Sequence, residues 1–202
     1  ESYKGGISFD GRSYEGFSYL LPDTIVFKNS ISAGSTLKKA YLISQRGLWV
    51  VGSKPIPDMP LHIIFNNHNL TIDSTDIVTN YYHCDYSNPS EPLSTIVKDV
   101  TAFAIGNNNK LIIPCQHCNI FDGQPVYDGF SLVLLYSDNA LPTVNAVIFL
   151  NNQTSYTSLT HNLSGLNKIN TANDVGLSTF IMNPDADSIT FNLISTLGNQ
   201  YL

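Results

Sequence analysis

The chain has 202 residues, which is enough for one large all-β domain or for a domain with an extra arm, and its net charge is −6. Only 13% of the residues are charged, and Asp outnumbers Glu by 13 to 3, whereas Asn and Ser occur 21 times each. This composition favours strands and turns over helices. Because the charge is negative and the longest basic run is Lys38-Lys39, we expect no nucleic-acid partner. No apolar run reaches 18 residues, so we expect no membrane span.

Residues 1–23 are predicted to form an N-terminal arm in front of a β-sandwich domain over residues 24–202. Apolar and aromatic side chains alternate with glycines along the arm, and Ile7 and Phe9 share one face. A free arm would be polar and disordered, so we expect this one to be held in a sheet. It is either the first strand of its own domain or a strand added to a neighbouring subunit.

Short strands separated by turn residues are predicted along the rest of the chain. The expected strands cover residues 24–27, 37–44, 48–51, 62–65, 70–72, 96–105, 111–113, 144–150, 179–182 and 188–194. Arg46-Gly47, residues 66–69 and Gly106–Asn109 are interpreted as turns, residues 73–95 as a long loop, and residues 153–176 as holding one short helix. The predicted fold class is therefore all-β, a β-sandwich or jelly-roll with at most one short helix.

The most strongly patterned strand runs from Asp128 to Tyr136 and is apolar on both faces. One face carries Phe130, Leu132, Leu134 and Tyr136, and the other carries Val133 and Leu135. A strand of this kind lies inside a sheet and is covered on both sides, by its own domain or by a neighbour.

Four segments in this order, residues 37–42, 97–103, 128–136 and 147–149, resemble a family of β-sandwich domains in secreted and surface-displayed, adhesin-like proteins of bacteria and archaea. The resemblance covers about residues 35–195 and implies an extracellular, cell-surface location and no catalysis. The chain departs from that family in lacking flanking repeats and a sorting motif. A short single-domain version is also similar to subunits of bacterial and archaeal pili and threads, in which an N-terminal strand completes the sandwich of the next subunit.

The cysteines and the sequons are the candidate sites of covalent modification. In an extracellular chain a structural disulfide is the first interpretation of Cys84, Cys115 and Cys118, with a zinc site that includes His83 and His117, or free thiols, as alternatives. The spacing does not decide which cysteines pair. Three sequons predict N-glycosylation at Asn69, Asn152 and Asn162.

No complete catalytic or metal-binding motif is present, so we expect neither an enzyme nor a cofactor. The predicted function is that of a structural subunit of an extracellular filament, whose partners are copies of itself. The arm would enter the next subunit through Ile7, Phe9, Tyr14 and Phe17, beside an acceptor strand that carries Phe130, Leu132, Leu134 and Tyr136.

The alternative function is that of an adhesin or viral surface domain. It would bind a receptor, or host or cell-surface glycans, through exposed loops that carry Trp49, Tyr81 and Tyr82.

Overall fold

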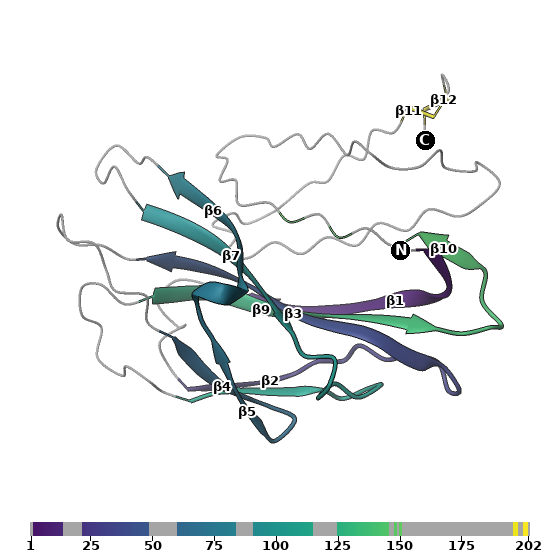
Figure 1. Cartoon of the computed structure of the whole chain (residues 1–202), viewed down its shortest axis with the longest axis horizontal. Helices are drawn as coiled ribbons and strands as arrows, with labels where there is room; N and C mark the ends of the chain where they lie inside the picture. Colours follow the sequence, from purple (N-terminus) through teal and green to yellow (C-terminus); the bar gives the residue numbers. More distant parts are fainter. Residues whose placement is uncertain are drawn as a thin grey trace.

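The structure is a computed structural model that describes residues 2–13, 22–48, 60–83, 91–114, 125–145, 148, 150, 196–197 and 200–201. Strands make up most of this part, and its one helical turn is η2 (Ser74–Asp76). The strands are β1 (Ser2–Ser13), β2 (Asp23–Val26), β3 (Thr36–Leu48), β4 (Leu61–Phe65), β5 (His68–Ile72), β6 (Ile77–His83), β7 (Glu91–Asp99), β8 (Lys110–Ile113), β9 (Pro125–Ser137), β10 (Thr143–Asn145), β11 (Thr196–Leu197) and β12 (Gln200–Tyr201). The predicted all-β fold class is confirmed (Figure 1).

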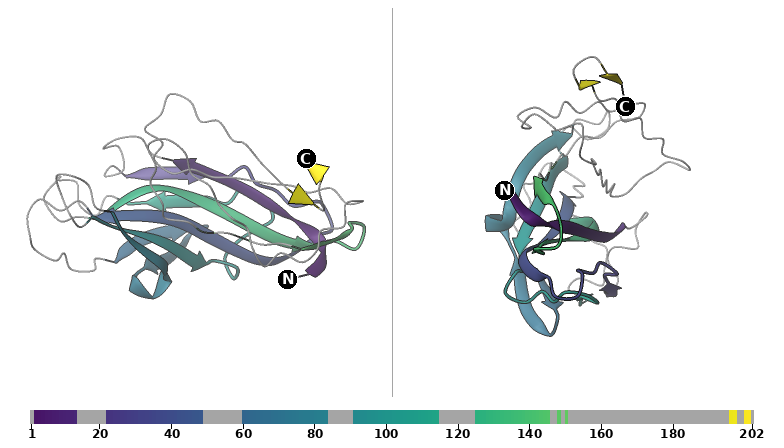
Figure 2. Two further views of the ribbon diagram at one scale, coloured as in Figure 1. Left: turned by 90° about the horizontal axis from the view of Figure 1, so that it is seen from above. Right: turned by 90° about the vertical axis from the view of Figure 1, so that its right-hand side faces the viewer.

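Two antiparallel sheets form a sandwich-like fold. The large sheet has the strand order β10-β1-β9-β3-β7-β6, and the small sheet has the order β2-β8-β4-β5. Among the described strands, β11 and β12 pair with each other. In Figure 1 the small sheet lies as a layer beneath the large one, and the two views of Figure 2 show that the large sheet is strongly curved.

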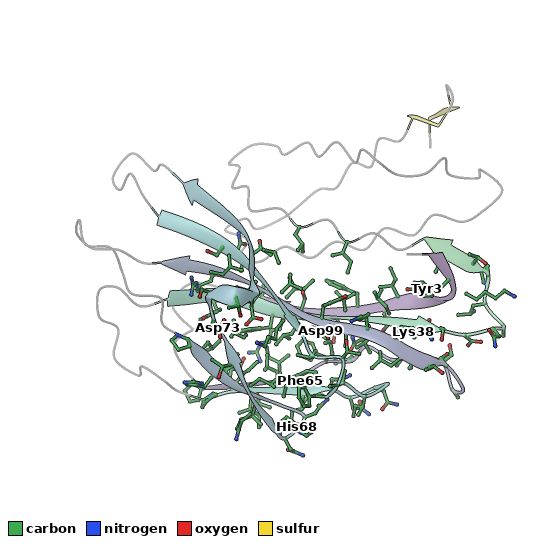
Figure 3. The ribbon with its side chains drawn as sticks, in the orientation of Figure 1. Tyr3, Lys38, Phe65, His68, Asp73 and Asp99 are labelled. Carbon is green, nitrogen blue, oxygen red and sulfur yellow. The ribbon has the colours of Figure 1, made fainter. Side chains whose placement is uncertain are left out.

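The main core lies between the sheets and contains the fully buried rings of Phe27, Phe65 and Phe130. Phe65 projects from the small sheet into this layer (Figure 3). A second cluster of Ile43, Val133 and Leu135 covers the opposite face of the large sheet. Five partly buried side chains pack against this second cluster, those of Tyr3, Phe9, Tyr41, Val97 and Leu150.

The predicted central strand is β9, which lies between β1 and β3. Leu132 and Leu134 belong to the main core, and Val133 and Leu135 belong to the second cluster. The expectation that this strand would be covered on both faces is therefore confirmed. The hairpin predicted around residues 66–69 is also found, because β4 and β5 are joined by Asn66-Asn67, both at positive φ as a tight hairpin turn requires.

Two predictions for the first half of the chain were wrong. Arg46-Gly47 is not a turn but continues β3, because Gly47 is paired with β7 on one side and with β9 on the other. Residues 73–95 are not one long loop, since they hold η2, β6 and the start of β7. β6 is the outer strand of the described large sheet, a position that tolerates the polar composition of this segment.

The strand predicted over residues 96–105 ends earlier, at Asp99. The chain turns there because the amides of Phe103 and Ala104 both donate to the carbonyl oxygen of Val100 (2.9 Å each). The predicted return strand is β8, but it pairs with β2 and β4 of the small sheet rather than with β7. Of the strand predicted over residues 144–150, the structure describes β10, and the helix over 153–176 and the strands over 49–51, 179–182 and 188–194 lie outside the described residues.

Candidate functional site

β1 lies antiparallel to β9 over nine residue pairs, from Gly5–Ser137 to Ser13–Gly129. Its first residues, Ser2 to Lys4, pair with β10. The arm therefore pairs, within one chain, with the strand that the sequence identified as its acceptor. Insertion into another copy stays a prediction.

Glycines at both ends of this pairing allow the two backbones to approach closely. A Cβ atom on Gly5 would collide with the carbonyl oxygen of Tyr136, and one on Gly129 would collide with the carbonyl oxygen of Arg12. Both glycines also have positive φ, at +155° and +143°, a conformation that L side chains rarely adopt. The ends of the β1–β9 pairing are thus specific to glycine.

The face of β1 that points toward the small sheet carries Ser8, Asp10 and Arg12, which we call the polar row. Ser8 Oγ accepts a hydrogen bond from the amide of Ser30 (3.0 Å), and Asp10 Oδ2 accepts one from the amide of Lys28. Arg12 Nη1 lies 3.2 Å from both carboxylate oxygens of Asp23. The polar row therefore joins β1 to the chain that forms the border of the small sheet.

That border, residues 23–31, is called the edge segment here, and its amides point alternately in two directions. The amides of Phe27 and Ile31 donate to the carbonyl oxygens of Asn109 (2.8 Å) and Gly106 (2.9 Å). The amides of Lys28 and Ser30 point the other way, to the polar row. An exposed row of amides would attract foreign strands, and the polar row satisfies it instead.

β1 thus occupies a slot with two walls, the backbone edge of β9 and the edge segment. The walls are joined to each other without β1, because the buried Asn29 of the edge segment donates from Nδ2 to the carbonyl oxygen of Leu132 in β9 (3.1 Å). β9 is also paired along its other edge with β3. The slot therefore does not depend on β1 alone for its shape.

The structure places the predicted donor residues as follows. Ile7 is 44% exposed and Phe9 packs against the second cluster, so both point away from the small sheet, whereas Tyr14 and Phe17 lie outside the described residues. The predicted acceptor residues Phe130, Leu132 and Leu134 are fully buried in the main core, and Tyr136 is half-buried opposite Gly6.

Sequence reasoning missed the polar row. The available signal was the alternation of Ser8, Asp10 and Arg12 with Ile7 and Phe9, a period of two that assigns one polar and one apolar face to a strand.

Of the predicted modification sites, Asn69 alone is described. It is exposed on β5, beside a hollow of about 350 Å³ that His62, Ile64, Thr71 and Pro114 help to line. The Nδ1 atom of His62 lies 3.0 Å from Thr71 Oγ1 on the neighbouring strand. Asn69 is accessible to a modifying enzyme, and its glycosylation stays a prediction.

The remaining predicted residues give no site in the described chain. Cys84, Cys115, Cys118, Asn152, Asn162 and Trp49 lie outside the described residues. Tyr81 and Tyr82 are part of β6 rather than of an exposed loop, so the loop prediction for these two was wrong. Within the described ranges, no three His, Cys, Asp or Glu residues gather as a metal-binding group, and no helix is long and apolar enough to cross a membrane.

Two carboxylates away from the slot have lowered pKa values. Hydrogen bonds from the side chain and the amide of Thr75 lower the pKa of Asp73, with a smaller effect from the charge of Lys98. Burial raises the pKa of Asp99, but the hydrogen bonds from Thr101 and Lys39 and the charge of Lys39 together outweigh burial and lower it. Both carboxylates accept hydrogen bonds from nearby backbone amides, Asp73 as the cap of η2 and Asp99 at the end of β7.

No family model matches the chain, and neither the curated proteins nor the solved structures contain a match to it. The resemblance to surface-displayed β-sandwich domains therefore stays a prediction, and the functional argument depends on the slot and its strand.

Proposed function

We propose that this protein is a structural subunit of an extracellular filament, in which each copy places its β1 in the slot of the next copy. The observation that carries the proposal is the slot itself. Its two walls are joined through Asn29 and Leu132 independently of β1, so they would offer a second copy the same contacts. Backbone pairing with a sheet edge is a recurrent way to bind an extended strand.

The contact is head-to-tail, because the strand of one copy meets the slot of another. A contact of this type does not close on itself unless its rotation forms a ring, and otherwise it propagates as a filament. Exchange of an identical element replaces each contact by the same contact in another chain, so it costs little free energy once the strand has left its own slot. The extracellular location is supported by the polar, weakly charged composition and by the resemblance described above.

Disulfide trapping of the full chain tests the proposal. Ile7 and Leu135 are directly opposite in the β1–β9 register. Opposite residues of an antiparallel pair have Cα atoms about 4.5–5.5 Å apart, which suits a disulfide. The double variant Ile7→Cys/Leu135→Cys is allowed to assemble, is then oxidised, and is analysed by non-reducing electrophoresis, peptide mapping and negative-stain electron microscopy. We expect filaments and a ladder of oligomers linked between positions 7 and 135.

Two controls make the result specific. The pair Ile7→Cys/Val133→Cys is out of register by two residues and should form no ladder, because diagonal positions are too far apart for a disulfide. The single variant Ile7→Cys accounts for links to the native cysteines. Monomers that carry only a disulfide within one chain, with no filaments, would refute the proposal. They would show that β1 pairs within its own chain alone.

A further inference from the structure

We infer that the polar row is a recognition code, so that the slot selects a strand with a hydroxyl, a carboxylate and a cation at alternating positions, namely residues 5–13 of this sequence. The role of this code between copies rests on the proposed function. Its role within one copy does not.

The wall formed by the edge segment presents three groups with different requirements. The amides of Ser30 and Lys28 each require an acceptor, and they receive it from Ser8 and Asp10. The carboxylate of Asp23 faces the guanidinium of Arg12 instead. Along the inserted strand, the wall therefore requires a hydrogen-bond acceptor opposite Ser30, a second acceptor opposite Lys28 and a cation opposite Asp23.

Two other contacts of β1 also select its sequence. Hydrogen bonds between the backbones of β1 and β9 are available to extended strands without proline, but the close approach at Gly5 admits only glycine there. On the outward face Ile7 is nearly half exposed, so replacing it by another side chain removes little packing, whereas Phe9 packs against the second cluster and favours an apolar residue. The polar row adds a selection on the inward face that neither Gly5 nor Phe9 provides.

The same code fixes the register of the strand. A slip of two residues in one direction brings Asp10 to Asp23, a contact between like charges, and leaves Gly6 opposite the Ser30 amide without an acceptor. A slip in the other direction brings Arg12, which has no acceptor, to the Lys28 amide. A slip of one residue turns the polar row outward and Ile7 and Phe9 inward. Only the observed register satisfies all three groups.

Charge reversal across the Arg12–Asp23 pair tests the inference. The full chains Arg12→Asp and Asp23→Arg each place like charges together, both within a copy and between identical copies. A one-to-one mixture that alternates the two chains restores opposite charges at every junction, as does the double variant Arg12→Asp/Asp23→Arg. Because the same like-charge contact occurs in the closed monomer and in the filament of a single variant, each single variant and the double variant should assemble close to the wild-type critical concentration. The mixture relieves the repulsion only in the filament, so its critical concentration should lie about fivefold below that of either single variant alone.

The outcomes separate the two proposals. If the wild-type chain assembles and the mixture has the same critical concentration as either single variant, the code is wrong and the filament proposal stands. If the wild-type chain does not assemble, the filament proposal is wrong. The code is then tested by measuring the amide hydrogen exchange of β1 in the monomer. Exchange about fivefold faster in each single variant, restored in the double variant, would then support the code within one copy, and unchanged exchange would overturn it.

Discussion

Asn109 is fully buried and satisfies three polar groups with one amide side chain. Its Oδ1 accepts hydrogen bonds from the Ile105 amide (2.9 Å) and from Asn66 Nδ2 (2.7 Å), and its Nδ2 donates to the Ile105 carbonyl oxygen (2.8 Å). Its own carbonyl oxygen accepts from Phe27 of the edge segment. This residue therefore shapes the turn against which one border of the slot is hydrogen-bonded.

Asn109→Ala should lower the free energy of unfolding by about 2–4 kcal/mol, because it leaves the amide and the carbonyl of Ile105 without partners inside the protein. Asn109→Asp keeps the shape but turns an oxygen toward the Ile105 carbonyl, so it should be no better. Asn107→Ala, at an exposed position of the same loop, is the control and should change stability by less than about 0.5 kcal/mol. Urea unfolding of the three variants measures the difference. A loss for Asn109→Ala as small as that of the control would contradict the assigned role.

At the scale of elements, the end of β7 is connected to β3 by one ion pair and two hydrogen bonds. Lys39 Nζ lies 3.1 Å from Asp99 Oδ2, the amide of Thr101 donates to Asp99 Oδ1 (2.9 Å), and the amide of Ala40 donates to Thr101 Oγ1 (3.0 Å). The carboxylate form of Asp99 is needed for the first two contacts. The attachment of β7 to β3 should therefore depend on pH.

Burial raises the pKa of Asp99, but the hydrogen bonds from Thr101 and Lys39 and the charge of Lys39 together lower it below its ordinary value of 3.8 in the folded protein. A lowered folded pKa means that the contribution of Asp99 to stability is complete above the unfolded pKa and is lost as the pH falls through the folded pKa. Asp99→Asn should thus destabilise the protein near pH 7, and the gap to the wild type should close on acidification below about pH 4. Unfolding curves at several pH values test this. Wild-type and variant stabilities that stay parallel down to about pH 2 would show that Asp99 does not contribute in this way.

At the scale of the whole molecule, exchange requires that β1 leave its slot before it enters another. Nine residue pairs and the polar row hold it there, so opening is a rare local unfolding event. The eight residues 14–21 that connect β1 to the rest of the fold span at most roughly 30 Å when extended. In a filament, the end of β1 in the neighbouring slot must therefore lie within about that distance of β2 in the copy that supplies the strand.

Urea at concentrations below the unfolding transition should shorten the half-time of assembly, because opening β1 exposes surface and is promoted by denaturant. Light scattering after dilution into matched urea solutions measures the rate. The Ile7→Cys/Leu135→Cys variant, oxidised within one chain as a monomer, should stay monomeric at every urea concentration and should assemble after reduction. Assembly of the locked monomer would indicate that another surface joins the copies.

The sequence by itself determined the fold class, the burial of the central strand and the turns at the asparagines. These features depend on local patterns, such as alternation along residues 128–136 and a hairpin turn at Asn66-Asn67. It also predicted that the arm is held in a sheet and that it enters beside the Phe130–Tyr136 strand of a neighbouring copy. The structure pairs the arm with that strand within one chain, and the pairing between copies stays a prediction.

Only the tertiary structure decided that Arg46-Gly47 continues a strand, that β8 crosses to the small sheet, and that β1 faces the edge segment with a polar side. Each of these depends on partners far away in the sequence. Gly47 stays extended because β7 and β9 pair with β3 on both sides of it. β8 belongs to the small sheet because it pairs with β2, where Ile25 lies, and with β4, where Ile64 lies. The residues that the slot recognises look like ordinary surface residues until the Ser30 and Lys28 amides are placed opposite them. Local alternation tells which residues share a face, whereas only packing tells what that face meets.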